Sequence, residues 1–329
     1  MTDAPGDAHS GHCCTPAAAS TPPPPIVEVV TGPHRVEQVK VPAGEFAMGD
    51  HHGDGYPADG EKPVHPVRLS AFQIDAVTVT NAAFAEFVDS TGYRTTAEEA
   101  GASAVFQGLV ADDADVVGRS SGASWWVAVR GADWAHPFGG TASLEGLEDH
   151  PVVHVSWYDA SAYCRWANRT LPTEAQWERA ARGSLTGARY PWGDTLLDPE
   201  GRWRCNIWQG DFPTVNTVDD GYAGTAPVRT YAPNDVGLWQ PTGNVWEWCA
   251  DFFDARWYRN ADQLDPIGPV RGRRRVLRGG SYLCHDSYCN RYRVAARSAN
   301  TPESSMGNAG FRTVAVSPTG RSVTDGAGV

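Results

Sequence analysis

The chain has 329 residues, with 27 Lys and Arg against 39 Asp and Glu, so its formal net charge at pH 7 is -12. This excess of negative charge argues against nucleic-acid binding through a basic face, and no apolar run reaches the roughly 18 residues of a membrane span. Glycine (35) and proline (24) are frequent and tryptophan (13) outnumbers phenylalanine (10), which predicts a loop-rich fold held by large aromatic side chains.

The two ends of the chain differ in composition from the part between them. Residues 1–35 are poor in aromatic residues and contain four consecutive prolines at 22–25, which predicts a disordered tail. No linker or fixed-period repeat interrupts the next part, so we expect one domain over residues 36–318. Residues 319–329 are predicted to form a second disordered tail.

The elements expected within this domain are short. Alternating apolar residues followed by a turn at 39–49 predict a strand pair. Helices are predicted after Thr80, Ser156 and Thr173, which are N-cap residues followed by apolar residues at helical spacing. Turn signals elsewhere recur every few residues. The expected fold class is therefore α+β, in one loop-rich domain with little regular secondary structure.

Seven cysteines occur, an odd number, and the N-terminus lacks the basic start and apolar core of a secretory signal. A disulfide framework is therefore not expected, and a cytoplasmic location with reduced thiols is predicted. The cysteines are Cys13, Cys14, Cys164, Cys205, Cys249, Cys284 and Cys289.

The densest cluster of unusual residues is segment 278–292, which reads RGGSYLCHDSYCNRY. Cys284 and Cys289 are five residues apart, so they share no face of a helix or strand and can converge only across a loop. They could be unreactive buried thiols, or part of a zinc site with His285 that lacks a fourth ligand. They could also form a reactive dithiol that binds Cu(I), kept deprotonated by nearby arginines. Those arginines are Arg278, Arg291 and Arg293.

Segment 278–312 closely resembles the C-terminal active-site segment of the formylglycine-generating enzymes, the sulfatase-modifying factors. The resemblance covers nearly all of residues 36–318 and implies that family's fold, which is related to C-type lectin-like domains. Most of its motifs recur across a wider superfamily, but the Cys284 and Cys289 pair is specific to the oxidase. The other matching segments are 44–50, 150–157, 171–178, 206–210 and 243–248.

The resemblance implies a copper-dependent oxidase that acts on unfolded sulfatases. It would convert the cysteine of a Cys-x-Pro-x-Arg motif to Cα-formylglycine, using O₂ and a thiol reductant, and would work as a monomer. Cys284 and Cys289 would bind Cu(I), with Ser281 near the oxygen site. The residues that resemble the family's peptide groove are Trp125, Arg297, Ser305 and Asn308. Without the resemblance, such residues could equally cap turns or fill the core.

The resemblance also implies two structural Ca²⁺ sites, built from oxygen donors in loops. The second departs from the family, because a glutamine stands where asparagine is frequent. The first site would use the side chains of Asn206 and Asp220 with the carbonyls of Ile207 and Tyr222. The second would use Gln240 and Glu247 with the carbonyls of Gly243 and Val245.

Two functions from other classes remain open. A lectin-like module could bind peptide or sugar without turnover, but it has no use for two convergent thiols. An iron-dependent sulfoxide synthase would need a histidine-rich metal site and usually a further helical domain. The tail holds a partial substrate motif, in which Cys14 and Pro16 are followed by Ala18 where arginine is required, and we interpret it as coincidence.

Overall fold

The computed structural model describes residues 31–316, so most of the tail predicted at 1–35 and all of the tail predicted at 319–329 lie outside the described residues. Contacts with the body begin slightly before the expected domain start at residue 36. The Gly32 amide donates to the Trp166 carbonyl at 2.9 Å, and His34 shares a 2.7 Å hydrogen bond with Asp75.

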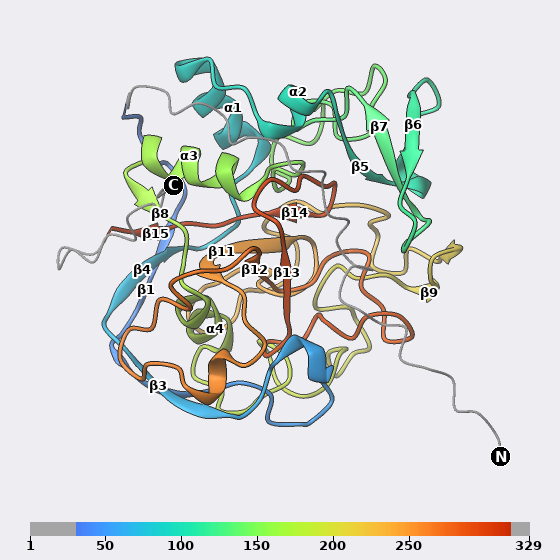
Figure 1. The fold of residues 1–329 in the computed structure, drawn as a ribbon. Helices are drawn as coiled ribbons and strands as arrows, with labels where there is room; N and C mark the ends of the chain where they lie inside the picture. Colours follow the sequence, from blue (N-terminus) through green and yellow to red (C-terminus); the bar gives the residue numbers. More distant parts are fainter. Residues whose placement is uncertain (1–30, 317–329) are drawn as a thin grey trace.

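The regular structure consists of short strands in small sheets joined by long irregular segments, as the glycine and proline content predicts (Figure 1). One four-stranded sheet has the order β1 (Gln38–Val41), β4 (Phe72–Asp75), β15 (Val314–Ala315), β8 (Arg169–Thr170). The other has the order β13 (Arg297–Asn300), β12 (Arg275–Arg278), β11 (Trp246–Phe252), β14 (Ala309–Gly310). The smaller sheets are β2 (Gly44–Met48) with β3 (His65–Leu69), β5 (Ala102–Phe106) with β7 (Trp126–Arg130) and β6 (Val116–Arg119), and β9 (Gly210–Asp211) with β10 (Val215–Asn216).

The three predicted helices are confirmed, together with their caps. The side chains of Thr80, Ser156 and Thr173 each accept a hydrogen bond from the backbone N–H three residues on. A short helix that we did not predict starts with a capping box between Thr95 and Glu98. The helices are α1 (Asn81–Thr91), α2 (Thr96–Ala100), α3 (Trp157–Trp166) and α4 (Glu174–Arg182), and 3-10 turns occur at Pro57–Asp59, Gln107–Leu109 and Trp257–Arg259.

The predicted strand pair at 39–49 is wrong in its pairing. Strands β1 and β2 both form there, but β1 pairs with β4 and β2 pairs with β3. A turn between two strands does not force them to pair when each edge meets a better partner from elsewhere in the chain.

The largest hydrophobic core is rich in aromatic residues and joins segments from Val79 to Phe311. Helices α1 and α3 lie in the upper part of the molecule in Figure 1. Their side chains Phe84, Phe87 and Tyr163 pack ring against ring in this core. The predicted α+β, loop-rich fold class is confirmed. None of the helices within residues 31–316 is long and apolar enough to cross a membrane.

Candidate active site

The two cysteines of segment 278–292 meet across the loop that joins β12 to β13, as their spacing predicted. We call residues 279–296 the thiol loop. Cys284 and Cys289 are 1% and 0% exposed, and their Sγ atoms are 3.0 Å apart. A disulfide would bring the two sulfurs to about 2.05 Å, so both are free thiols. Two backbone turns hold them, from the Cys284 amide to the Ser281 carbonyl and from the Cys289 amide to the His285 carbonyl.

Glycine is needed where the thiol loop starts. Gly279 and Gly280 both have positive φ, 93° and 75°. A Cβ on Gly279 would lie 2.7 Å from the Pro241 carbonyl oxygen, and one on Gly280 would lie 2.7 Å from the Arg291 carbonyl oxygen. The loop can therefore approach its neighbours this closely only without these side chains.

A shallow hollow, too narrow in this structure to admit a water molecule, lies over the two thiols. Its wall is aromatic. The ring of Trp125 lies edge-on to Tyr288 at 5.0 Å and to Phe212 at 5.2 Å, and Tyr288 stacks on Phe212 at 4.3 Å. The Trp125 Nε1 atom is buried and has no hydrogen-bond partner. The structure thus brings Trp125 to the hollow, while its contact with a substrate stays a prediction.

Ser281 and Asn308 link this hollow to a second segment of chain. The Asn308 side-chain amide donates to the Ser281 hydroxyl at 3.0 Å, and the Ser281 backbone N–H points at the Cys284 sulfur at 3.4 Å. Ser281 lines the hollow and is itself buried. Ser305, three residues before Asn308, is partly exposed and hydrogen-bonds Ser103 at 2.8 Å.

The expectation that Arg297 lines a peptide groove is wrong. Its side chain is 0% exposed and makes two hydrogen bonds to Glu174, at 2.6 and 2.8 Å. The guanidinium group of Arg297 also donates to the Gly60 carbonyl at 3.0 Å, and the Tyr258 ring lies 4.2 Å from its central carbon. A guanidinium enclosed by these partners cannot reach a substrate.

Arg278 belongs to the same buried cluster. It donates to Glu174 at 2.8 Å and to Glu178 at 2.5 Å. Burial alone would raise the pKa of Glu178, but the Arg182 and Arg278 guanidinium groups hold it at about 2. We call Arg278, Arg297, Glu174 and Glu178 the buried ion-pair network.

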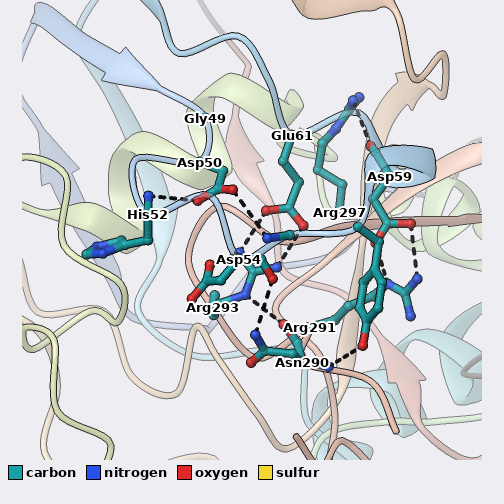
Figure 2. Close-up of polar contacts among 12 residues, drawn as sticks. Gly49, Asp50, His52, Asp54, Asp59, Glu61, Asn290, Arg291, Arg293 and Arg297 are labelled. Carbon is teal, nitrogen blue, oxygen red and sulfur yellow. Dashed lines mark hydrogen bonds and ion pairs between the residues drawn. The ribbon is translucent and has the colours of Figure 1, made fainter.

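The predicted role of the remaining arginines at the thiols is also not supported, because carboxylates bind them. Arg291 pairs with Asp59 at 2.5 Å, and Arg293 makes two 2.8 Å hydrogen bonds to Glu61. Figure 2 shows these carboxylates, from segment 50–61, turned toward the arginines that follow Cys289. Segment 50–61 therefore anchors the end of the thiol loop, a role that the sequence did not reveal.

The other three described cysteines differ from this pair. Cys164, Cys205 and Cys249 are free and buried, as expected for reduced thiols. Burial raises the pKa of each of them above its ordinary value. They are therefore held as neutral thiols within the core, where Cys205 and Cys249 are 0% exposed.

The first predicted calcium site contains oxygen atoms without hydrogen-bond donors. Asn206 Oδ1 and Asp220 Oδ2 are buried and have no hydrogen-bond partner. The Asn206 amide nitrogen donates to the Gly224 carbonyl at 2.8 Å, so Asn206 Oδ1 points away from Gly224. Buried oxygens without donors are uncommon, and a hard cation is one way to satisfy them.

The surroundings of Asp220 fit the same interpretation. Burial raises the pKa of Asp220, which means that the carboxylate lacks sufficient positive charge nearby. The Tyr222 amide donates to Asp220 Oδ1 at 3.0 Å. The Tyr231 hydroxyl also lowers the pKa of Asp220, but its geometry is not that of a hydrogen bond. The Ile207 carbonyl accepts from the Gln209 side chain. Asn206 and Asp220 thus fit a calcium ion.

The second predicted calcium site does not fit. Both oxygens of Glu247 are taken by Arg312, at 2.6 and 2.7 Å, and Trp177 Nε1 donates to one of them at 2.7 Å. A carboxylate already neutralised in this way is a poor ligand for a second cation. Gln240 does have a buried Oε1 without a partner, but its amide nitrogen is bound to the Pro227 carbonyl. The assignment of Glu247, with Gly243 and Val245, as a calcium site is therefore corrected.

Within residues 31–316, no group of three or more His, Cys, Asp and Glu side chains could hold a metal ion. Neither candidate metal site is of that kind. The thiol pair offers two soft ligands, a set that suits Cu(I). The calcium site relies on only one carboxylate, that of Asp220, together with Asn206 and backbone oxygens.

The chain is similar to known proteins over most of its length. Residues 28–316 match the sulfatase-modifying factor enzyme 1-like domain. The chain is 63% identical over 276 residues to the formylglycine-generating enzyme of Streptomyces coelicolor, covering 84% of this chain and 88% of the relative. It is 55% identical over 281 residues to that of Thermomonospora curvata, covering 84% and 92%. The structure of PvdO from Pseudomonas aeruginosa matches with a TM-score of 0.62 at 21% identity, covering 90% of this chain and 99% of that chain, and shows the fold alone.

Proposed function

The chain belongs to the family of sulfatase-modifying factor enzyme 1-like domains, and on this basis we propose that it oxidises a cysteine of sulfatases to Cα-formylglycine. The substrate is the Cys-x-Pro-x-Arg motif in an unfolded sulfatase segment. The relatives of the highest identity cited above carry this activity in their names. We propose that the protein acts as a monomer in the cytoplasm, where a reducing environment would keep its cysteines as thiols.

One observation carries the proposal, which is the pair of free thiols beneath an aromatic-walled hollow. Cys284 and Cys289 offer two soft sulfur ligands 3.0 Å apart, and the other buried cysteines have no such partner among the described contacts. Two thiolates are ligands that Cu(I) prefers, and the substrate thiol would be a third of the same kind. Copper held by these residues would supply the activation of O₂ that a thiol alone lacks.

The chain's own residues would position the substrate and exclude water. Trp125 and Tyr288, which both pack on Phe212, form an aromatic wall that would seat the proline of the motif. The Asn308 amide would hold the Ser281 hydroxyl in place, and the Ser281 backbone N–H points at the Cys284 sulfur, so Ser281 offers polar groups within the hollow. The buried ion-pair network contributes only by holding β12 and β13, from which the thiol loop extends.

The reaction stoichiometry supports the inclusion of O₂ and of a thiol reductant. Replacing the C–S bond by an aldehyde oxidises the substrate carbon by two electrons. Reducing O₂ to the aldehyde oxygen and one water requires four electrons. The remaining two come from a reductant, which two thiols supply as they form a disulfide, and the substrate sulfur leaves as hydrogen sulfide.

The proposal is tested with a synthetic Cys-x-Pro-x-Arg peptide, Cu(I) and a thiol reductant in air. Mass spectrometry should detect the mass loss that accompanies replacement of the thiol by the aldehyde oxygen, and a hydrazide reagent should then capture the product. Cys284→Ser and Cys289→Ser should each abolish conversion. Cys164→Ser, which alters a buried thiol outside the hollow, is the matched control and should retain it.

The same experiment addresses the rival functions. A peptide that binds but stays unconverted by the copper-loaded protein would favour a lectin-like binding module. Conversion that proceeds equally with and without the proline and arginine would show that the chain does not recognise a sulfatase motif. Activity that follows added iron instead of copper would favour the sulfoxide-synthase class.

A further inference from the structure

Three side chains far apart in the sequence, those of Ser305, Ser103 and His154, form one hydrogen-bonded chain. The Ser305 and Ser103 hydroxyl oxygens are 2.8 Å apart, and Ser103 Oγ is 2.8 Å from His154 Nδ1. The other ring nitrogen, His154 Nε2, is 2.9 Å from the Pro137 carbonyl oxygen. Ser103 and His154 are buried, whereas Ser305 is partly exposed. The chain thus runs from the interior to the surface.

The backbone holds these three residues at one edge of β5. The His154 amide donates to the Met306 carbonyl at 3.0 Å, and the Gly307 amide donates to the Ala104 carbonyl at 2.9 Å. His154 has φ of 58°, a left-handed conformation that is costly for a residue with a side chain. A Cβ on Gly307 would lie 3.1 Å from the Nε2 atom of His154. The histidine is therefore fixed tightly in one position.

The acceptor at the inner end sets the direction of every hydrogen bond in this chain. A carbonyl oxygen only accepts, so His154 Nε2 must carry the hydrogen that is donated to Pro137. Burial lowers the pKa of His154 to about 4, so the ring is neutral and Nδ1 is an acceptor. Ser103 must then donate to Nδ1, and the oxygen of Ser103 accepts the Ser305 hydroxyl hydrogen.

The consequence is a surface hydroxyl with a fixed polarity. The Ser305 hydrogen points inward, and its remaining lone pairs face outward, where they can only accept. Ser305 lies three residues before Asn308, whose amide contacts Ser281 in the hollow. An extended peptide presents backbone N–H donors along its edge, and those are the partners that such an acceptor needs.

We propose that Ser103 and His154 are positioning residues that hold the Ser305 hydroxyl as a pure acceptor for a backbone N–H of the bound peptide. This inference rests on the proposed function for the identity of the peptide. It differs from a purely structural role, because burial of Ser103 and His154 requires only that their polar atoms have hydrogen-bond partners. A positioning role also requires that changes at Ser103 act through Ser305.

The test uses a fluorescent peptide with serine in place of the target cysteine, which can bind but cannot react. Its Kd is measured by anisotropy for the wild type, Ser103→Ala, Ser305→Ala and the double variant, with melting curves to check folding. Ser305→Ala should weaken binding about fivefold to tenfold, the loss of one hydrogen bond. Ser103→Ala should weaken it about threefold, and the double variant should match Ser305→Ala alone.

Two further measurements keep the inference falsifiable if Ser103→Ala folds poorly. Ser103→Thr, which keeps the hydroxyl, should restore wild-type binding. Peptides in which single backbone N–H groups are replaced by ester oxygens should show one position that weakens binding to the wild type but not to Ser305→Ala. Additive losses in the double variant, or ester effects that are the same in both proteins, would overturn the inference.

Failure of the inference and failure of the proposed function give different results. If the cysteine peptide is converted but the binding losses are additive, only the positioning role is wrong. If the binding pattern appears but the cysteine peptide is never converted, the positioning role stands and the oxidase function is wrong.

Discussion

The buried ion-pair network and the thiol loop lie next to each other along the chain, but their buried polar atoms differ in the partners they have. In the network, Arg278 and Arg297 each bind carboxylates of α4 and have no exposed surface. In the thiol loop, Cys284 and Cys289 have mainly each other, beneath an aromatic wall where Trp125 Nε1 has no partner. Buried charges that are paired with opposite charges hold a structure in place, whereas a pair of buried thiols can receive a soft metal ion.

Substitutions in these two regions should therefore have different effects. Changes in the thiol loop should remove activity and leave the fold intact. Changes in the ion-pair network should lower the free energy of unfolding.

The largest effect is expected for Cys284→Ser. A serine hydroxyl is a poor ligand for Cu(I), so tight copper binding and turnover should both be lost. The free energy of unfolding should change by only about 1 kcal/mol, as for most single substitutions. Copper titration with a competing chelator, peptide turnover and urea unfolding measure the three quantities. Loss of stability in parallel with activity would break the separation between the two regions.

The next effect is expected for Glu174→Gln in the ion-pair network. This change leaves the buried Arg297 guanidinium without its carboxylate, and breaking such a pair costs about 3–5 kcal/mol. Urea unfolding should show this loss. The matched control is Glu45→Gln, whose partner Arg68 is exposed and 3.4 Å away, and it should cost less than about 1 kcal/mol. Equal losses in the two variants would contradict the assigned role of the network.

Asp251 is a buried carboxyl group beside the network, and it should make the stability of the protein depend on pH. Its Oδ2 accepts the Glu174 amide at 2.8 Å, and burial, with the Glu174 charge, raises its pKa to about 7. The unfolded chain loses this proton near pH 3.8, so between about pH 4 and 7 the folded state alone keeps it. The Asp251 contribution to stability therefore falls as pH rises through this window, by up to about 1.4 kcal/mol per pH unit, and is constant above it.

Asp251→Asn isolates that contribution, because an asparagine oxygen can still accept from the Glu174 amide and does not ionise. The difference in free energy of unfolding between variant and wild type should grow in favour of the variant from pH 4 to 7. Urea unfolding at pH 4.5, 5.5, 6.5 and 7.5 measures it. A difference that does not vary with pH would show that Asp251 is ionised in the folded protein throughout.

The smallest effect is expected from calcium, which should stabilise the fold without taking part in the reaction. A ligand that binds only the folded state adds about 2.7 kcal/mol when present at 100 times its Kd. A calcium chelator should therefore lower the melting temperature of the wild type by several degrees. Asp220→Ala should melt at that lower temperature with or without chelator, whereas Gln240→Ala should respond as the wild type does. Equal responses from both variants would argue against the Asn206 and Asp220 site.

The sequence by itself determined the local features of this protein. Thr80, Ser156 and Thr173 mark helix starts because a cap and its N–H lie three residues apart, within reach of local bonding. The spacing of Cys284 and Cys289 required a loop for the same kind of reason, since five residues fit no face of a regular element.

Only the tertiary structure decided which distant groups meet. Arg293 and Glu61 are separated by 232 residues, and any of many carboxylates could have served this arginine. The same holds for the pairing of β1 with β4, for the enclosure of Arg297, and for the capture of Glu247 by Arg312 at the predicted second calcium site. The residue types determine charge and hydrogen-bonding capacity, but the partner that satisfies each group depends on how the whole chain packs around it.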